Sequence, residues 1–248
     1  MNFRGFSHAF RSRTAQEEGL VNELKFVGDE TLADSAIALM EAGCLSDSEY
    51  PEGKIHSIYF DGPHRSFHAE KMDGDNLKLK VRIRWYGRPD PPGDAEIPVF
   101  IEAKHRLGSA RRKHRIAVPV PERWINEVPL DDPSLPAFLY RHAGALGEAI
   151  PLNLIPVLCI SYDRRRYRCP QTDSRIAVDR RIRADRINGR EFPSAARIQV
   201  DRTVCEFKHP GQALPSWSQA LYQAGFRLRS FSKYGECMNQ VLQGGAPP

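Results

Sequence analysis

The sequence predicts an α+β fold built on one large antiparallel sheet or barrel. Seven segments alternate apolar and polar residues over the length of a strand, and only four helical patterns lie between them. The 248 residues are 41% hydrophobic and 27% charged, which is the composition of an ordinary globular protein that can bury one large core. We therefore expect a single domain over residues 1–248, with residues 1–20 and 243–248 at its periphery.

The expected strands follow from alternation with period two. Each one places apolar side chains at every second position and is rich in β-branched or aromatic residues. In chain order they are VNELKFV (21–27), KIHSIYF (54–60), LKLKVRIRWY (77–86), PVFIEAKHR (98–106), VLCISYDRRRY (157–167), SRIAVDRRI (174–182) and TVCEFK (203–208). We find no internal repeat in the chain.

The expected helices follow from apolar residues at helical spacing. The first covers 31–43, where Thr31 followed by Asp34 resembles a capping box and Gly43 suits the end of the helix. The others fall within 134–150, over 217–226 and over 232–242. Many strands with few helices favour an α+β domain built on an antiparallel sheet or barrel.

Composition excludes several classes of protein. The longest nearly continuous apolar run, LIPVLCI (154–160), is far shorter than the roughly 20 residues that span a bilayer. The amino terminus is basic and lacks the apolar stretch of a secretory signal, so we expect a cytoplasmic protein without a membrane segment of its own. Five widely spaced cysteines without a C-x-x-C pair argue against a disulfide framework and against a zinc site.

Charged residues lie on one face of four expected strands. In LKLKVRIRWY, every second residue of the first eight is basic, and the residues between them are apolar. Because successive side chains of a strand point to opposite sides, this strand has one apolar and one positive face. The same separation recurs at Glu23 and Lys25, at Glu102, Lys104 and Arg106, and at Glu206 and Lys208.

The charged faces allow two interpretations. If they point to water, the E-x-K pairs are weak surface ion pairs worth about 0–1 kcal/mol. If the sheet closes with these faces inward, they line a cationic tunnel that needs a polyanion and metal ions for neutralisation. The excess of 27 arginines over 9 lysines suits a polyanion, because the guanidinium fork matches pairs of phosphate oxygens, although a GC-rich genome gives the same bias.

Eight short motifs follow one another along the chain: ELKF (23–26), IYFDG (58–62), VRIRWYG (81–87), FIEAKHR (100–106), SYDRRRYR (161–168), SRIAVD (174–179), CEFK (205–208) with PSW (215–217), and FSKY (231–234). In this order the motifs resemble the polyphosphate polymerase domain of the vacuolar transporter chaperone (VTC) family. That family is a branch of the triphosphate tunnel metalloenzymes, which also include the CYTH phosphatases. The chain resembles the stand-alone bacterial versions of this domain.

The resemblance implies a closed antiparallel tunnel of about eight strands surrounded by helices. It implies catalytic roles for Lys25, Arg82, Arg84 and Lys233, and phosphate binding by Lys71, Lys104, Lys113, Arg164, Arg175 and Lys208. Glu206 resembles the carboxylate that binds a divalent metal, Mn²⁺ or Mg²⁺, with a salt bridge to a nearby cation as the alternative. Glu23 and Glu102 are weaker candidates for the metal, and Lys71 stands where the family pattern leads us to expect arginine.

The implied activity is transfer of the γ-phosphate of ATP to a growing inorganic polyphosphate chain. A tripolyphosphatase or nucleoside triphosphatase with the same tunnel is the first alternative, and a non-catalytic polyphosphate-binding module is the second. The expected partners are ATP and polyphosphate. Clustered cations with an aromatic residue in RRRYR (164–168), and the basic ARRKHR (110–115), also suit nucleic acid, which we do not expect here.

Overall fold

In the part of the chain that the structure describes, one antiparallel sheet of eleven strands forms the centre of the fold. The computed structural model describes residues 22–72, 77–88, 93–107, 110–147, 149–209 and 217–244. The main path of the sheet runs β11 (Arg227–Leu228), β1 (Asn22–Gly28), β10 (Thr203–His209), β8 (Ser174–Ile187), β7 (Ile155–Cys169), β3 (Glu52–Asp61), β4 (Leu77–Tyr86), β5 (Glu96–Leu107) and β6 (Ala110–Pro121). Two short strands lie beside it, since β2 (Leu45–Ser46) pairs with β7 and β9 (Ile198–Val200) pairs with β8.

Every expected strand is present, and the sheet also contains strands that the sequence pattern did not indicate. β4 has the expected bounds, whereas β7 and β8 are longer than expected because they pair with each other along almost their whole length. The unexpected β6 pairs with β5 from Glu96 opposite Pro121 to Leu107 opposite Ala110. Prolines are tolerated in β6 because it is an edge strand that pairs on one side.

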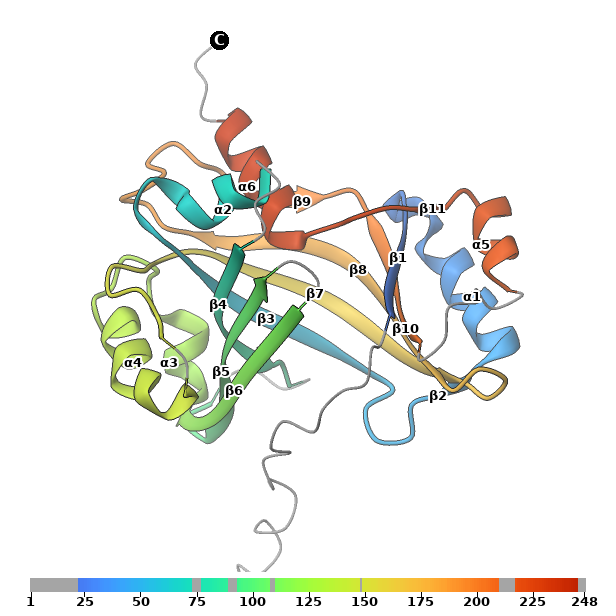
Figure 1. The fold of residues 1–248 in the computed structure, drawn as a ribbon, viewed down its shortest axis with the longest axis horizontal. Helices are drawn as coiled ribbons and strands as arrows, with labels where there is room; N and C mark the ends of the chain where they lie inside the picture. Colours follow the sequence, from blue (N-terminus) through green and yellow to red (C-terminus); the bar gives the residue numbers. More distant parts are fainter. Residues whose placement is uncertain are drawn as a thin grey trace, which may run out of the picture.

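Among the described residues, six α-helices surround the sheet (Figure 1). They are α1 (Ala33–Gly43), α2 (Ser66–Met72), α3 (Glu122–Glu127), α4 (Ser134–Ala143), α5 (Ser218–Gln223) and α6 (Lys233–Gly244), with single 3₁₀ turns at η1 (Glu30–Leu32), η2 (Pro63–Arg65) and η3 (Gly144–Leu146). The capping box expected at Thr31 is wrong: α1 begins at Ala33 after a 3₁₀ turn without a side-chain cap. Asp34 instead accepts a hydrogen bond from Arg180 of β8 at 2.8 Å. No helix in the described ranges is long and apolar enough to cross a membrane.

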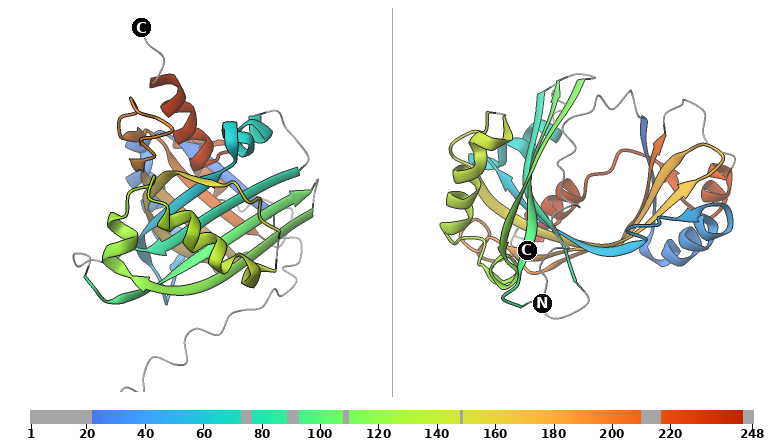
Figure 2. Two further views of the ribbon diagram at one scale, coloured as in Figure 1. Left: turned by 90° about the vertical axis from the view of Figure 1, so that its left-hand side faces the viewer. Right: turned by 90° about the horizontal axis from the view of Figure 1, so that it is seen from below.

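The sheet curls into a deep trough, with β4, β5 and β6 as one wall and β1 and β10 as part of the other (Figure 2). Helices α3 and α4 cover the outer face of the first wall, where they bury Ile83 and Trp85 of β4. Helices α1 and α5 cover the outer face near β10 and bury Phe207. Each large apolar side chain that is buried in this way contributes roughly 1.5–3 kcal/mol, so the apolar faces turn outward to the helices and the charged faces line the trough.

The predicted α+β class and large antiparallel sheet are confirmed. The strand path has two ends, β11 and β6, and no pairing between them is found in the described part of the chain. Helix α6 packs at the trough end opposite the β4 carboxyl terminus, where Met238 contacts a buried cluster that includes Tyr59 and Ile160. Residues 1–20, expected to be peripheral, lie outside the described residues, and α6 continues to Gly244.

Candidate functional site

A cavity of about 580 Å³ occupies the trough. Ten lysine and arginine side chains line it, against three glutamates, so the described lining carries a clear excess of positive charge. The alternation of β4 explains how the cations arrive there: Val81, Ile83 and Trp85 are buried on the outer face, which leaves Arg82 and Arg84 facing inward. Such a lining attracts and holds an anion with several charges.

The structure brings together nine of the eleven residues predicted for the site. These are Lys25, Arg82, Arg84, Lys104, Lys113, Arg164, Glu206, Lys208 and Lys233. Arg175 does not line the cavity; it is exposed at the end of β8, opposite Lys208 in the strand register. Lys71 belongs to α2, and its side chain lies outside the described part of the structure.

Glu102 of β5 is the centre of the cationic wall. Its side chain is 4% exposed, and its Oε2 accepts a hydrogen bond from Arg82 Nε at 2.7 Å. Lys113 Nζ lies 3.3 Å and Arg115 Nε 3.5 Å from the other oxygen, Oε1. Burial would raise the pKa of Glu102, but the charges of Arg82, Arg84 and Lys113 outweigh it and hold this pKa well below its ordinary value. Glu102 therefore stays ionised and fixes the cations of β4 and β6.

Asp179 of β8 has the same role on the opposite wall. It is fully buried and accepts hydrogen bonds from Arg164 Nε at 2.5 Å, Arg164 Nη2 at 2.7 Å and Lys233 Nζ at 2.5 Å. Burial would raise the pKa of Asp179, but Arg164 and Lys233 hold it well below its ordinary value. The buried carboxylate thus positions Arg164 of β7 and Lys233, the first residue of α6, side by side at the cavity surface.

Tyrosine and serine hydroxyls orient the two arginines of β4. Arg82 Nη1 donates to Tyr59 Oη at 3.1 Å. Arg84 donates from Nη2 to Tyr162 Oη at 3.3 Å and from Nε to Ser57 Oγ at 3.2 Å. Because a guanidinium has five N–H donors, both arginines retain donors that can face a bound anion.

The wall formed by β1 and β10 carries the remaining carboxylates. Glu23 Oε1 lies 3.1 Å from Lys25 Nζ, and burial, which would raise the pKa of Glu23, is outweighed by Lys25, Lys104 and Lys208, which lower it to about 2. Glu206 is different, because each of its oxygens lies 3.9 Å from its nearest recorded cation, Arg164 or Lys208. Its side chain is 15% exposed and lines the cavity. Among the described carboxylates of the site, Glu206 has the longest ion pairs, so its oxygens are the most available to bind another cation.

These residues fit a divalent metal ion that takes most of its ligands from phosphate and water. No cluster of three or more histidine, cysteine or acidic side chains suited to a metal occurs in the described ranges. Mg²⁺, however, is commonly bound by one or two carboxylates together with substrate phosphates and several waters. Glu206 offers one such carboxylate beside the cations that would hold the phosphates, whereas Glu102 is fully engaged by arginine and lysine.

The segment 229–232, between β11 and α6, connects the two walls. Arg229 N donates to Lys25 O at 3.0 Å, and Lys25 Nζ donates to Phe231 O at 3.1 Å, which attaches the segment to β1. Lys80 Nζ of β4 donates to Ser232 Oγ at 3.4 Å on the other wall. The segment therefore contributes its own lining and ties together strands that do not pair with each other.

Comparison with known proteins identifies the family. The model of the VTC domain matches residues 32–242, which is most of the chain and contains nearly all of the cavity lining. This chain belongs to the VTC domain family. The resemblance seen in the sequence motifs is thereby confirmed, and no curated protein matches the chain.

Two solved structures are similar to this VTC domain at low identity. One is a proposed adenylate cyclase of Bacillus halodurans, with 12% identity and a TM-score of 0.44 over 83% of this chain and 87% of that chain. The other is a proposed adenylate cyclase of Vibrio parahaemolyticus, with 11% identity and a TM-score of 0.42 over 91% of this chain and 99% of that chain.

The candidate site of this VTC domain also contains residues that the sequence did not single out. Tyr59 and Tyr162 lie in expected strands, but only the strand register places their hydroxyls beside Arg82 and Arg84. Asp179 is the last residue of the motif SRIAVD. Its burial under Arg164 and Lys233 depends on the pairing of β7 with β8 and on the position of α6, which the sequence does not indicate. For Lys80, which also lines the cavity, the alternation of LKLKVRIRWY indicates the face of the strand on which it lies.

Proposed function

We propose that this VTC domain is a metal-dependent polyphosphate polymerase that transfers the γ-phosphate of ATP to a growing inorganic polyphosphate chain. The observation that carries the proposal is the cavity of about 580 Å³ with ten basic side chains in its lining. Such a cavity suits a linear anion with one or more charges per phosphate, which would cross the trough beneath the segment 229–232. With such a chain bound, the walls and this segment would act as a tunnel.

The basic residues would hold donor and acceptor phosphates in line. Arg82 and Arg84 present forks that match two phosphate oxygens each, and their orientation is fixed by Glu102 and by tyrosine hydroxyls. Arg164 and Lys233 approach from the opposite wall, fixed by Asp179. Phosphoryl transfer needs mainly positioning and neutralisation of developing charge, so a rigid cationic cavity supplies much of the catalysis.

Three carboxylates of the site, Glu23, Glu102 and Asp179, favour transfer to phosphate over transfer to water, and the available Glu206 is assigned in this proposal to the metal ion. Hydrolysis requires a base that activates water, but Glu102 and Asp179 are held by cations and have pKa values well below the ordinary range. Glu23 has a pKa of about 2 and is a similarly weak base. The terminal phosphate of a polyphosphate chain is already an anion at neutral pH and needs no such base.

Glu206 would hold the Mn²⁺ or Mg²⁺ ion, with Glu23 as a second possible carboxylate. A bound divalent ion would neutralise phosphate oxygens and lower the charge repulsion between donor and acceptor. Lys208 Nζ, which lies 3.9 Å from Glu206 Oε1, would help to hold this carboxylate in place.

Incubation of the purified protein with ATP and Mn²⁺ or Mg²⁺ tests this proposal when ADP, free phosphate and polyphosphate are resolved separately. We expect ADP together with polyphosphate. ADP with free phosphate alone would instead support the hydrolase alternative. Absence of ADP, with polyphosphate still bound, would support the binding module.

Arg82 provides the variant that tests the site itself. Arg82→Ala removes the contacts to Glu102 and Tyr59 as well as a phosphate fork, and we expect kcat/KM to fall by about 100-fold or more. Arg82→Lys keeps the charge without the fork and should retain part of the activity. Arg123→Ala is the matched control, because Arg123 is exposed, pairs with Asp94 and does not line the cavity. Unchanged turnover in Arg82→Ala would show that the reaction occurs elsewhere.

A further inference from the structure

Two cysteines distant in sequence lie opposite each other where β2 meets β7. The register pairs Leu45 with Arg168 and Ser46 with Tyr167, so the next position pairs Cys44 with Cys169. The backbone of Cys44 is extended, with φ −134° and ψ 154°, and therefore continues the direction of β2. The sequence alone could not indicate this pair, because the strands β2 to β6 lie between its two members along the chain.

Backbone hydrogen bonds between β2 and β7 show that Cys44 and Cys169 form a non-hydrogen-bonded pair of the antiparallel ladder. Asp47 N donates to Arg166 O at 2.9 Å, and the alternation of an antiparallel ladder then makes Leu45 and Arg168 a hydrogen-bonded pair. Cys44 and Cys169 fall at a non-hydrogen-bonded position, where opposite Cα atoms are only about 4.5 Å apart and side chains approach closely. That separation lies within the range of Cα distances of disulfides, about 4.4–6.8 Å.

The two thiols differ in accessibility and in environment. Cys169 is fully buried in the apolar cluster beneath α1 and α5, and the half-buried Cys44 packs against the same cluster. The thiols also interact with each other: burial, followed by the Cys169 thiol, raises the pKa of Cys44 to about 11. At Cys169 burial would raise the pKa, but hydrogen bonds, including one from Thr172, lower it.

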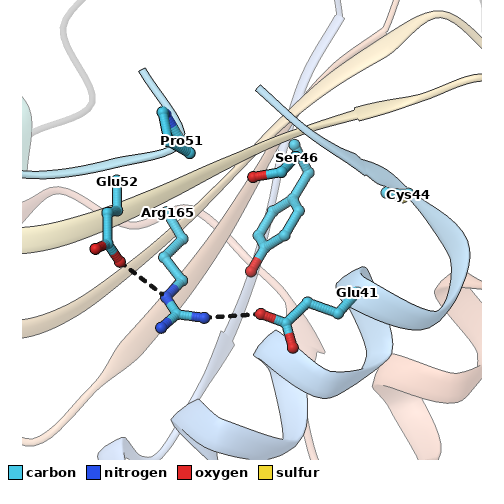
Figure 3. Close-up of a pocket in the computed structure, with 7 residues that line it drawn as sticks. Glu41, Cys44, Ser46, Pro51, Glu52 and Arg165 are labelled. Carbon is cyan, nitrogen blue, oxygen red and sulfur yellow. Dashed lines mark hydrogen bonds and ion pairs between the residues drawn. The ribbon is translucent and has the colours of Figure 1, made fainter. Parts of the chain in front are cut away.

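Small molecules can reach Cys44 from solvent. Cys44 lines a cavity of about 420 Å³ on the outer face of the sheet, together with Arg165 and Tyr167 of β7 (Figure 3). Arg165 crosses this cavity between Glu41 at 2.7 Å and Glu52 at 3.5 Å. This cavity is separate from the cationic one, with which it shares no lining residue.

A hydrogen-bonded chain leads from Cys169 across the sheet to a histidine. Beyond the contact with Cys169, Thr172 Oγ1 lies 2.7 Å from Ser174 Oγ, which in turn lies 2.9 Å from His209 Nδ1. Ser174 is opposite Cys169 in the register of β7 and β8. This chain gives the buried thiol a route for its proton to a half-buried imidazole.

We propose that Cys44 and Cys169 are a reversible redox pair, which hydrogen peroxide converts into a cross-strand disulfide that fastens the end of α1 to β7. In the first step the solvent-accessible Cys44 attacks peroxide through the small fraction present as thiolate; the O–O bond breaks, and the hydroxide that leaves takes up the proton lost by the thiol, so that a sulfenic acid and one water form. In the second step Cys169 attacks that sulfur, the S–O bond breaks as the S–S bond forms, and the thiol proton leaves in a second water. Two thiols and one peroxide thus give one disulfide and two waters.

The other three cysteines lack this arrangement. Cys159 lies opposite Ile58 and Arg186 in the register, and Cys205 lies opposite Phe26 and Val178. Cys237 lies in α6, and all three are buried. Oxidation of the folded protein is therefore expected at a single pair.

Mass spectrometry of the purified protein treated with hydrogen peroxide tests the proposal. We expect the intact mass to fall by two hydrogen atoms, a linked peptide that joins Cys44 to Cys169, and full reversal by a thiol reductant. The closed loop is longer than 100 residues, so Tm should rise by about 5–15 °C on oxidation. Cys44→Ser, at a half-buried position, should lose both the linked peptide and the rise in Tm, whereas Cys237→Ala should keep them.

Several results would overturn the proposal, and none depends on whether the domain turns over ATP. One is oxidation of Cys44 to a sulfinic acid while Cys169 remains open to alkylation in the unfolded, quenched protein. Others are a disulfide that maps to another pair of cysteines, and a chain that keeps five free thiols at peroxide concentrations that oxidise a small-molecule dithiol.

Discussion

Replacement of Asp179 by asparagine probes how strongly the cationic site depends on its buried carboxylates. The side chain is fully buried between Arg164 and Lys233, with three hydrogen bonds of 2.5–2.7 Å. Asparagine has nearly the same shape, but it leaves two cations without their counter-charge. Removing one partner from a buried ion pair costs about 3–5 kcal/mol, because the remaining charge is buried and unpaired.

The expected loss can be measured by thermal unfolding. For a chain of this size each kcal/mol corresponds to roughly 2–4 °C, so Asp179→Asn should lower Tm by about 6–20 °C. Inorganic tripolyphosphate should return part of this loss, because an anion that binds the native state replaces the missing charge and stabilises by mass action. The gain in Tm from tripolyphosphate should therefore be larger in the variant than in the unchanged protein.

Asp173→Asn is the matched control for this experiment. Asp173 pairs with Arg168 at 2.5 Å, but both side chains are about two-thirds exposed, and such a pair is worth about 0–1 kcal/mol. Its backbone has a positive φ of 53°, which asparagine also tolerates. The control should melt within about 2 °C of the unchanged protein. If Asp179→Asn did the same, the buried carboxylate would not organise the site.

Two further predictions concern Glu206 and acid stability. If Glu206 holds the metal ion as proposed, Glu206→Gln should raise the Mn²⁺ concentration for half-maximal turnover by about 10-fold or more, and an unchanged metal titration would contradict that proposal. The folded-state pKa of Glu23, about 2, lies below its ordinary value of 4.5, so its contribution to stability is complete above pH 4.5 and is lost as the pH falls towards 2. The free energy of unfolding measured with urea should therefore fall between pH 4.5 and pH 2. In Glu23→Gln it should fall by less over the same pH range.

The sequence predicted the sheet and much of the cavity because one rule, alternation along a strand, determines both. The apolar positions of LKLKVRIRWY face helices, and the basic positions face the trough, as the burial of Ile83 and Trp85 demonstrates. The same rule failed for β6, since ARRKHRIAVPVP mixes a run of cations with two prolines and shows no clean alternation. An exposed edge strand needs neither alternation nor a full set of N–H donors, so its sequence carries little signal.

The parts of the site that the sequence left unseen depend on contacts across strands. Asp179 meets Lys233 only because α6 begins where β7 and β8 pair, and Tyr162 meets Arg84 only through β3, which lies between their strands. Conversely, Arg175 had the correct residue type and the correct face, but its position at the end of β8 places it outside the cavity lining. Residue type and alternation predict which face a side chain takes, whereas register decides which side chains meet.

The proposed reaction moves phosphate from ATP to a phosphate chain inside the cationic cavity. The most direct test uses ATP labelled at the γ-phosphate with Mn²⁺ and compares the label in polyphosphate with the ADP released at each time point. We expect label to enter polyphosphate in equal amount to ADP, and we expect Arg82→Ala to abolish both. ADP matched by labelled free phosphate, with none in polyphosphate, would contradict this proposal.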